Sequence, residues 1–218
     1  MSYSSKQFQE YALDVKIRQE LSDDIRYEQI GKVIYLMTIP SRIHEAIVQQ
    51  IQKQMGIYFD DLDSSCMVYG SNSSLDLSER VDFLKGFDEF QDFFSESDFQ
   101  QLSFLPDVQV ICDDEGEDSW TSKGYKGIPG IAVEVLSPST KIRDLTIKKD
   151  FYERVGISEY WIIEDIRKVT VYTLINGKYV PKEFSLCKDS EEVLEVKSEL
   201  FKDLTVNFNK KYFYKFKS

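Results

Sequence analysis

The fold of this chain is decided by residues 131–163, which read IAVEVLSPSTKIRDLTIKKDFYERVGISEYWII. Residues 131–136 are almost continuously apolar, which is typical of a strand buried on both faces at the centre of a sheet. A Ser-Pro-Ser-Thr turn at 137–140 leads into a predicted helix over 141–155, which ends at Gly156. A second buried strand is predicted at 159–163. The stretch therefore predicts a strand, a helix and a strand in succession, which indicates an α/β fold.

The flanking sequence extends this pattern in both directions without a repeat or a visible domain boundary. The predicted elements are a polar helix at 5–22, a hairpin at 26–37 around Gly31-Lys32, a helix opening at Pro40-Ser41, a strand at 106–112 and a hairpin around Asn176-Gly177. We expect one domain over residues 1–218, built on a mixed β-sheet.

Composition places the chain among ordinary globular proteins. It has 218 residues, of which 42% are hydrophobic and 14% aromatic, and these fractions are too high for a disordered chain. The formal net charge is −11. Since phosphate binding depends on clustered Lys and Arg, this charge argues against a sequence-independent coat protein for nucleic acids. A local basic site is still open, because Lys141, Arg143, Lys148 and Lys149 lie close together in the sequence.

Part of the acidity is concentrated in one segment, residues 71–103, which we interpret as an insertion. Between 76 and 98 it has eight acidic residues against Arg80 and Lys85, while Phe83, Phe87, Phe90 and Phe94 recur at helical spacing. One interpretation is a helix whose phenylalanines complete the core. The other is a docking segment for a protein partner or a second subunit.

The three cysteines, Cys66, Cys112 and Cys187, are far apart and form no CxxC motif. This spacing argues against a disulfide framework and a thiolate zinc site, so we expect buried, reduced thiols in a cytoplasmic protein. The N-terminus has no signal-peptide pattern, and no stretch is apolar enough for a membrane span.

Two carboxylates interrupt the predicted core strands. Glu134 lies within the apolar run 131–136, where an ionised side chain is unfavourable unless it is paired or binds a metal. Asp107 begins the predicted strand 106–112 directly after Pro106. The alternatives are an edge strand that exposes Glu134 and ordinary turn chemistry at Asp107. Together the two residues form a candidate carboxylate pair.

Lys148 interrupts the apolar face of the helix that follows. Lys148 follows Leu145 by three residues, and it precedes Phe151 by three and Tyr152 by four. At these spacings it shares their helical face and should point inward. The alternative is that its apolar stem is buried while the ammonium reaches solvent. Two carboxylates and a lysine indicate a site for Mg²⁺ or Mn²⁺, because oxygen ligands suit these cations.

These residues also carry a resemblance to a known family. The sequence resembles the Uma-type putative restriction endonuclease family of the PD-(D/E)xK nuclease superfamily over roughly residues 10–208. The matching positions are Pro106-Asp107, 132–140, Arg143-Asp144, Lys148, Tyr152 and 156–163, with a looser match at Tyr27-Glu28, Gly31, Met37, Pro40 and His44.

The resemblance implies a restriction-endonuclease-like core, in which a mixed central β-sheet is flanked by α-helices. It implies that Asp107 and Glu134 bind the metal and that Lys148 is the superfamily lysine. That lysine usually lies two residues after the glutamate, where this chain has Leu136. Glu28 would be an additional N-terminal carboxylate. His44 matches a family position near the site, although a structural or exposed histidine is equally open.

The function predicted from these residues is a Mg²⁺-dependent endonuclease that hydrolyses phosphodiester bonds in DNA with a metal-activated water. Two other interpretations stay open: a binding or regulatory protein on a nuclease fold, and a hydrolase of another phosphate ester. A homodimer is compatible with the first, since many nucleases of this superfamily pair to cut both strands.

Overall fold

The computed structural model describes residues 12–14, 26–31, 33–78, 102–112, 119–122, 124–187, 190 and 192–210. The chain divides into two compact units. The first comprises residues 1–39, 73–105 and 117–127, and the second comprises residues 40–72, 106–116 and 128–218. The expectation of a single domain over 1–218 stays a prediction.

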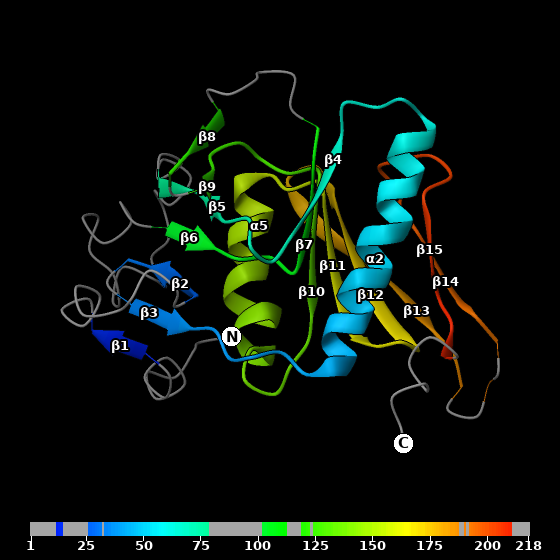
Figure 1. Cartoon of the computed structure of the whole chain (residues 1–218), viewed down its shortest axis with the longest axis horizontal. Helices are drawn as coiled ribbons and strands as arrows, with labels where there is room; N and C mark the ends of the chain where they lie inside the picture. Colours follow the sequence, from blue (N-terminus) through cyan, green and yellow to red (C-terminus); the bar gives the residue numbers. More distant parts are fainter. Residues whose placement is uncertain are drawn as a thin grey trace. The chain divides into compact units, whose positions relative to one another are not determined.

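The second unit is built on a six-stranded mixed sheet (Figure 1). Strand β10 pairs in parallel with β11 and antiparallel with β7. The remaining neighbours are antiparallel, in the order β13-β12-β11-β10-β7-β4. The strands are β4 (Met67–Gly70), β7 (Val108–Ile111), β10 (Ile131–Val135), β11 (Glu159–Asp165), β12 (Lys168–Ile175) and β13 (Lys178–Ser185). The predicted central position of residues 131–136 is confirmed, because β10 is buried along its whole length.

Helices cover the two faces of this sheet, as Figure 1 shows for α2 and α5. Helix α2 (Arg42–Asp61) begins after Ser41, whose side chain accepts a hydrogen bond from the His44 amide. Its apolar stripe packs against Val133 and its neighbours on one face of the sheet. A two-stranded sheet of β14 (Leu194–Lys197) and β15 (Thr205–Phe208) contributes to the same core. The mixed sheet flanked by helices agrees with the predicted fold class.

The other face carries the helical segment that follows β10. It comprises α4 (Lys141–Arg143), a π-helical turn η5 (Asp144–Lys148) and α5 (Lys149–Val155). Gly156 ends the segment at a positive φ of 97°, a conformation that glycine adopts without steric cost. The hairpin between β12 and β13 turns at Asn176 and Gly177, both with positive φ. The predicted helix and hairpin are thus confirmed.

The first unit contains a seven-stranded sheet in the order β1-β3-β2-β6-β5-β9-β8. Its strands are β1 (Ala12–Asp14), β2 (Tyr27–Ile30), β3 (Val33–Leu36), β5 (Leu75–Asp76), β6 (Leu102–Phe104), β8 (Trp120–Thr121) and β9 (Gly124–Tyr125). The hairpin at Gly31 is confirmed. The helix predicted over 5–22 is wrong at 12–14, where β1 pairs with β3. The phenylalanines of the acidic insertion lie outside the described residues.

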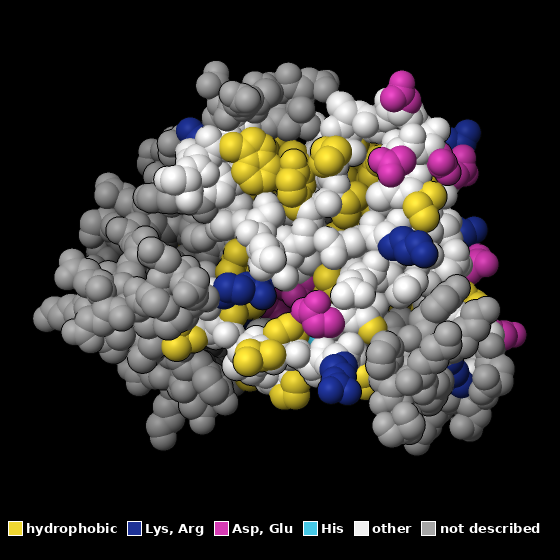
Figure 2. Space-filling model, in the orientation of Figure 1, with side chains coloured by type: hydrophobic (Ala, Val, Ile, Leu, Met, Phe, Trp, Pro, Cys, Tyr) yellow, Lys and Arg dark blue, Asp and Glu magenta, His cyan; other side chains and the backbone are white. Residues whose placement is uncertain are grey.

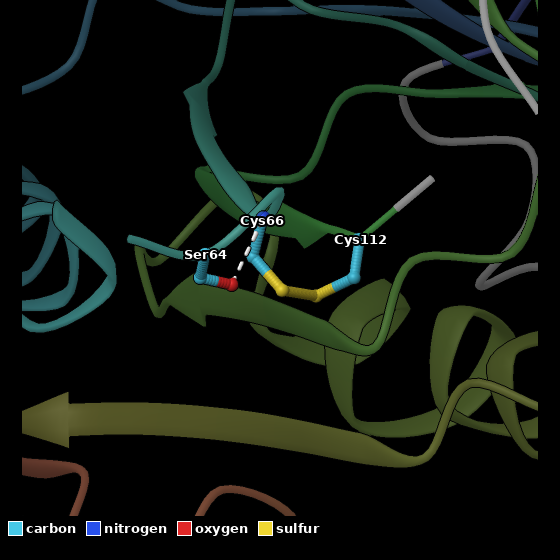
Figure 3. The surroundings of a disulfide bond; sticks show 3 residues. All are labelled: Ser64, Cys66 and Cys112. Carbon is cyan, nitrogen blue, oxygen red and sulfur yellow. Dashed lines mark hydrogen bonds between the residues drawn. A yellow bond between two sulfur atoms is a disulfide. The ribbon is translucent and has the colours of Figure 1, made fainter. Parts of the chain in front are cut away.

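The prediction of reduced cysteines is wrong for Cys66 and Cys112, which form a disulfide (Figure 3). Strands β4 and β7 are antiparallel with Met67 opposite Ile111, so the cysteines one step beyond face each other. The sequence hides this pairing because the two cysteines lie 46 positions apart. Cys187 is free, and it is exposed rather than buried. A disulfide is unusual in cytosolic proteins, so the cysteine argument for a cytoplasmic location no longer holds.

None of the helices in the described part of the chain has the length and hydropathy that a membrane span requires.

Candidate active site

Glu134 lies on β10 at the centre of the six-stranded sheet, and Asp107 directly precedes the neighbouring strand β7. The antiparallel pairing of these strands ends with Val133 opposite Val108, so Asp107 and Glu134 are each one residue beyond this last pair. The Asp107 side chain reaches β10 at the Val135 amide, the residue after Glu134. The structure thus places Asp107 next to the strand that carries Glu134.

The Asp107 carboxylate is held through one of its oxygens. Its Oδ2 accepts a hydrogen bond of 2.8 Å from the Val135 amide and lies 3.1 Å from Nε2 of His44, in the first turn of α2. Within the described residues Oδ1 has no hydrogen-bond partner. This oxygen is the one left to bind a cation.

Two opposing effects act on the pKa of His44 beside Asp107. Burial by itself lowers the pKa of the imidazole, but the hydrogen bond and the negative charge of Asp107, with the charge of Glu45, raise the pKa above its usual value. The interaction favours the protonated ring, which donates to Asp107. The sequence placed His44 near the site only through the family resemblance, and the structure gives it a contact.

Glu134 is paired with Lys148. The ammonium Nζ lies 2.7 Å from Oε1 of Glu134, and the two side chains are only 1% and 4% exposed. Lys148 thus faces inward with its charged end as well as its stem, as the helical face predicted. The Tyr152 hydroxyl lies 3.5 Å from the same Oε1, at the outer limit of a hydrogen bond.

Asp144 is a third buried acid of this cluster, to which the sequence assigned no role. Its Oδ1 lies 3.4 Å from the Lys148 ammonium, and its side chain is 1% exposed. The signal that could have found it is its position four residues before an inward-facing lysine, where acidic and basic side chains meet on a helix. Tyr152, four residues after Lys148, carries the same signal.

Glu28, the remaining predicted carboxylate, belongs to the first unit. It is fully buried on β2, and its Oε1 accepts a hydrogen bond of 2.9 Å from the Leu105 amide. Leu105 precedes Asp107 by two residues in the sequence. The proposed role of Glu28 in the site stays a prediction.

The donor set of Asp107 and Glu134 fits a hard divalent cation. Both ligands are carboxylate oxygens, and Oδ1 of Asp107 is not engaged by another described residue. The described residues contain no group of three or more His, Cys, Asp or Glu side chains that could hold a metal ion. Two carboxylates are nevertheless sufficient for Mg²⁺, which usually completes its coordination with water and substrate phosphate.

Comparison with known proteins gives a consistent assignment. The model of the Uma2 family, described as "Putative restriction endonuclease", matches residues 7–208. The structure is similar to the crystal structure of a putative nuclease belonging to DUF820 from Anabaena variabilis, with a TM-score of 0.61 and 16% sequence identity. The alignment covers 93% of this chain and 98% of that one, and at this identity it shows the fold. The chain matches no curated protein.

Proposed function

Because the chain belongs to the Uma2 family of putative restriction endonucleases, we propose that it is a Mg²⁺-dependent endonuclease that hydrolyses phosphodiester bonds in DNA. The observation that carries the proposal is the buried ion pair between Lys148 and Glu134. Glu134 belongs to β10, which pairs with the strand that follows Asp107. Burying the charged groups of Glu134, Lys148 and Asp107 opposes folding, so their presence is better explained by a function than by stability. The resemblance to the PD-(D/E)xK superfamily implies that such a set of two carboxylates and a lysine serves metal-dependent phosphodiester hydrolysis.

Asp107 and Glu134 would hold the cation, either Mg²⁺ or Mn²⁺. When bound, the cation supplies positive charge at the scissile phosphate and makes a nearby water more acidic. His44 and the Val135 amide hold one oxygen of Asp107, so that the carboxylate is already oriented before it binds. Glu28 is a further candidate carboxylate on the family resemblance alone.

Lys148 would act on the substrate through its charge. Its ammonium is buried beside Glu134, where water screens it poorly. A positive group fixed in such a place stabilises negative charge that develops on the phosphate in the transition state. Lys148 can also orient the attacking water by donating a hydrogen bond to it.

The net charge of −11 limits the expected affinity for bulk DNA. On the face drawn in Figure 2, acidic and basic side chains are interspersed over α2. Of the basic residues near the site, Lys141 is half exposed and lies 3.9 Å from Glu164. We therefore expect cleavage to depend on the site and on bound metal more than on tight, nonspecific binding of DNA.

The proposal is tested by cleavage of supercoiled plasmid and of single-stranded DNA with Mg²⁺, Mn²⁺ or a chelator. Glu134→Gln and Lys148→Ala should each lower the rate by about 100-fold or more. Lys182→Ala is the matched control, because this lysine pairs with Glu199 on the exposed surface.

Equal nicking by all variants would show that the site is assigned wrongly. If the wild-type protein neither cleaves DNA nor binds Mn²⁺ in calorimetry, the endonuclease proposal fails and a binding or regulatory role on a nuclease fold is favoured.

A further inference from the structure

We infer that Asp144 is a positioning residue, which holds the Lys148 ammonium in place when Glu134 engages a cation; this rests on the proposed function. Asp144 is buried to the same degree as Lys148, and its Oδ1 lies 3.4 Å from Nζ. Glu134, on strand β10, lies 2.7 Å from the same nitrogen through its Oε1. The ammonium is therefore shared between a carboxylate of the sheet and a carboxylate of its own helix.

Asp144 and Lys148 are the two ends of the π-helical turn η5. Asp144, Lys148 and Tyr152 are spaced four residues apart, and in a regular α-helix each such step rotates the side chain by about 40° around the axis. A turn with hydrogen bonds from i to i+5 rotates less per residue, so the step from Asp144 to Lys148 offsets the rotation of the step to Tyr152. The structure thus places Asp144 beside Lys148, whose ammonium and the Tyr152 hydroxyl both reach Glu134.

The irregular turn is supported from the sheet. The fully buried Tyr160 of β11 donates a hydrogen bond of 3.0 Å from its hydroxyl to the backbone carbonyl of Asp144. Burial, with the charges of Glu134 and Asp144, raises the pKa of Tyr160 well above its usual value, so the hydroxyl keeps its proton. π-Turns inside helices are often found at functional sites.

The balance of charge explains what Asp144 is needed for. Without it, Lys148 and Glu134 form a neutral pair, and a cation on Glu134 would compete with the ammonium for the same carboxylate and repel it. With Asp144 the three groups carry a net charge of −1, and the ammonium would keep an anionic partner if Glu134 bound a cation. Removing the Asp144 charge should therefore weaken cation binding and misplace Lys148.

Two other roles for Asp144 can be separated from a positioning role by experiment. As a direct metal ligand, Asp144 would contribute to cation binding whether or not Lys148 is present. A purely structural role can be separated by a matched control. Glu159 is equally buried and accepts hydrogen bonds from Trp161, Ser198, Glu199 and Leu200.

The experiment compares Asp144→Asn with Glu159→Gln in the full chain. Asp144→Asn should lower kcat by about 10- to 100-fold with little change in KM, because the lysine it positions acts in the transition state. Glu159→Gln should lower the unfolding temperature but leave kcat unchanged. A folded Asp144→Asn variant with wild-type kcat would overturn the inference.

Calorimetric Mn²⁺ binding gives a second readout that does not depend on cleavage. Asp144→Asn should weaken binding by about tenfold when Lys148 is present, and by clearly less in the Lys148→Met background. An equal loss in both backgrounds would mean that Asp144 acts on the cation directly, which contradicts a positioning role. If the wild-type protein binds Mn²⁺ but cuts no DNA, the proposed function fails while this comparison still decides the role of Asp144.

Discussion

Replacing Lys148 by methionine tests how the buried charges of the site compensate one another. Methionine has a similar length but no charge, so Glu134 and Asp144 would remain buried without the ammonium that lies between them. A buried charge that has lost its partner is strongly unfavourable. We expect the variant to fold with a much lower free energy of unfolding than the wild-type protein.

The size of the loss follows from the two distances. At an effective dielectric constant of about 20, the attraction is roughly 6 kcal/mol at 2.7 Å and roughly 5 kcal/mol at 3.4 Å. Desolvation of the ions cancels much of this attraction, so removing one partner costs about 3–5 kcal/mol. For a chain of this length, such a loss lowers the unfolding temperature by roughly 10 °C.

The assay is urea unfolding in the presence of a chelator, for Lys148→Met, Glu134→Gln and the double variant. Because most of the cost comes from the unpaired carboxylate, the double variant should be more stable than Lys148→Met alone. Lys182→Met is the surface control, and it should change stability by less than about 1 kcal/mol.

The reasoning is refuted if Lys148→Met is within 1 kcal/mol of wild type, a difference of about the size expected for a surface pair. It is also refuted if the two substitutions add, since additive losses would mean that Glu134 and Lys148 do not interact.

Three further predictions concern other parts of the second unit. His44→Phe removes the donor to Asp107 Oδ2 and should weaken Mn²⁺ binding by about tenfold, whereas Arg42→Ala should not; calorimetry decides, and equal affinities would refute the orienting role. Burial alone would raise the pKa of Glu153, but hydrogen bonds from Lys178 and the Tyr179 amide lower it overall. The stability that this lowered pKa provides is present above the unfolded pKa near 4.5 and is lost as the pH falls through the lower folded pKa. Glu153→Gln should therefore cost about 1–2 kcal/mol at pH 7 and less in acid, which unfolding measured across pH would show. Reducing the Cys66–Cys112 disulfide, whose cysteines are 46 positions apart, should lower stability by up to about 4 kcal/mol, and Cys187→Ser should leave the effect of reductant unchanged.

The sequence by itself determined the elements around the site. The apolar run at 131–136, the periodicity of 141–155 and the Asn176-Gly177 turn are local signals, because each reports how a short segment meets the core or turns back on itself. The inward position of Lys148 followed from the same periodicity. The helix predicted over 5–22 rested on a weak apolar stripe, and pairing of β1 with β3 prevailed at residues 12–14.

Only the tertiary structure decided which residues meet. The pairing of β7 with β10 brings Asp107 to the Val135 amide, and the start of α2 brings His44 to Asp107 from 63 positions away in the sequence. The same holds for the disulfide, since the register of β4 against β7 sets Cys66 opposite Cys112. The π-turn over Asp144–Lys148 was likewise not predicted, although the spacing of Asp144 and Lys148 is the one at which such pairs meet on a helix. Local propensity selects helices and strands, but contacts between distant segments depend on sheet register and packing, which no short stretch of sequence contains.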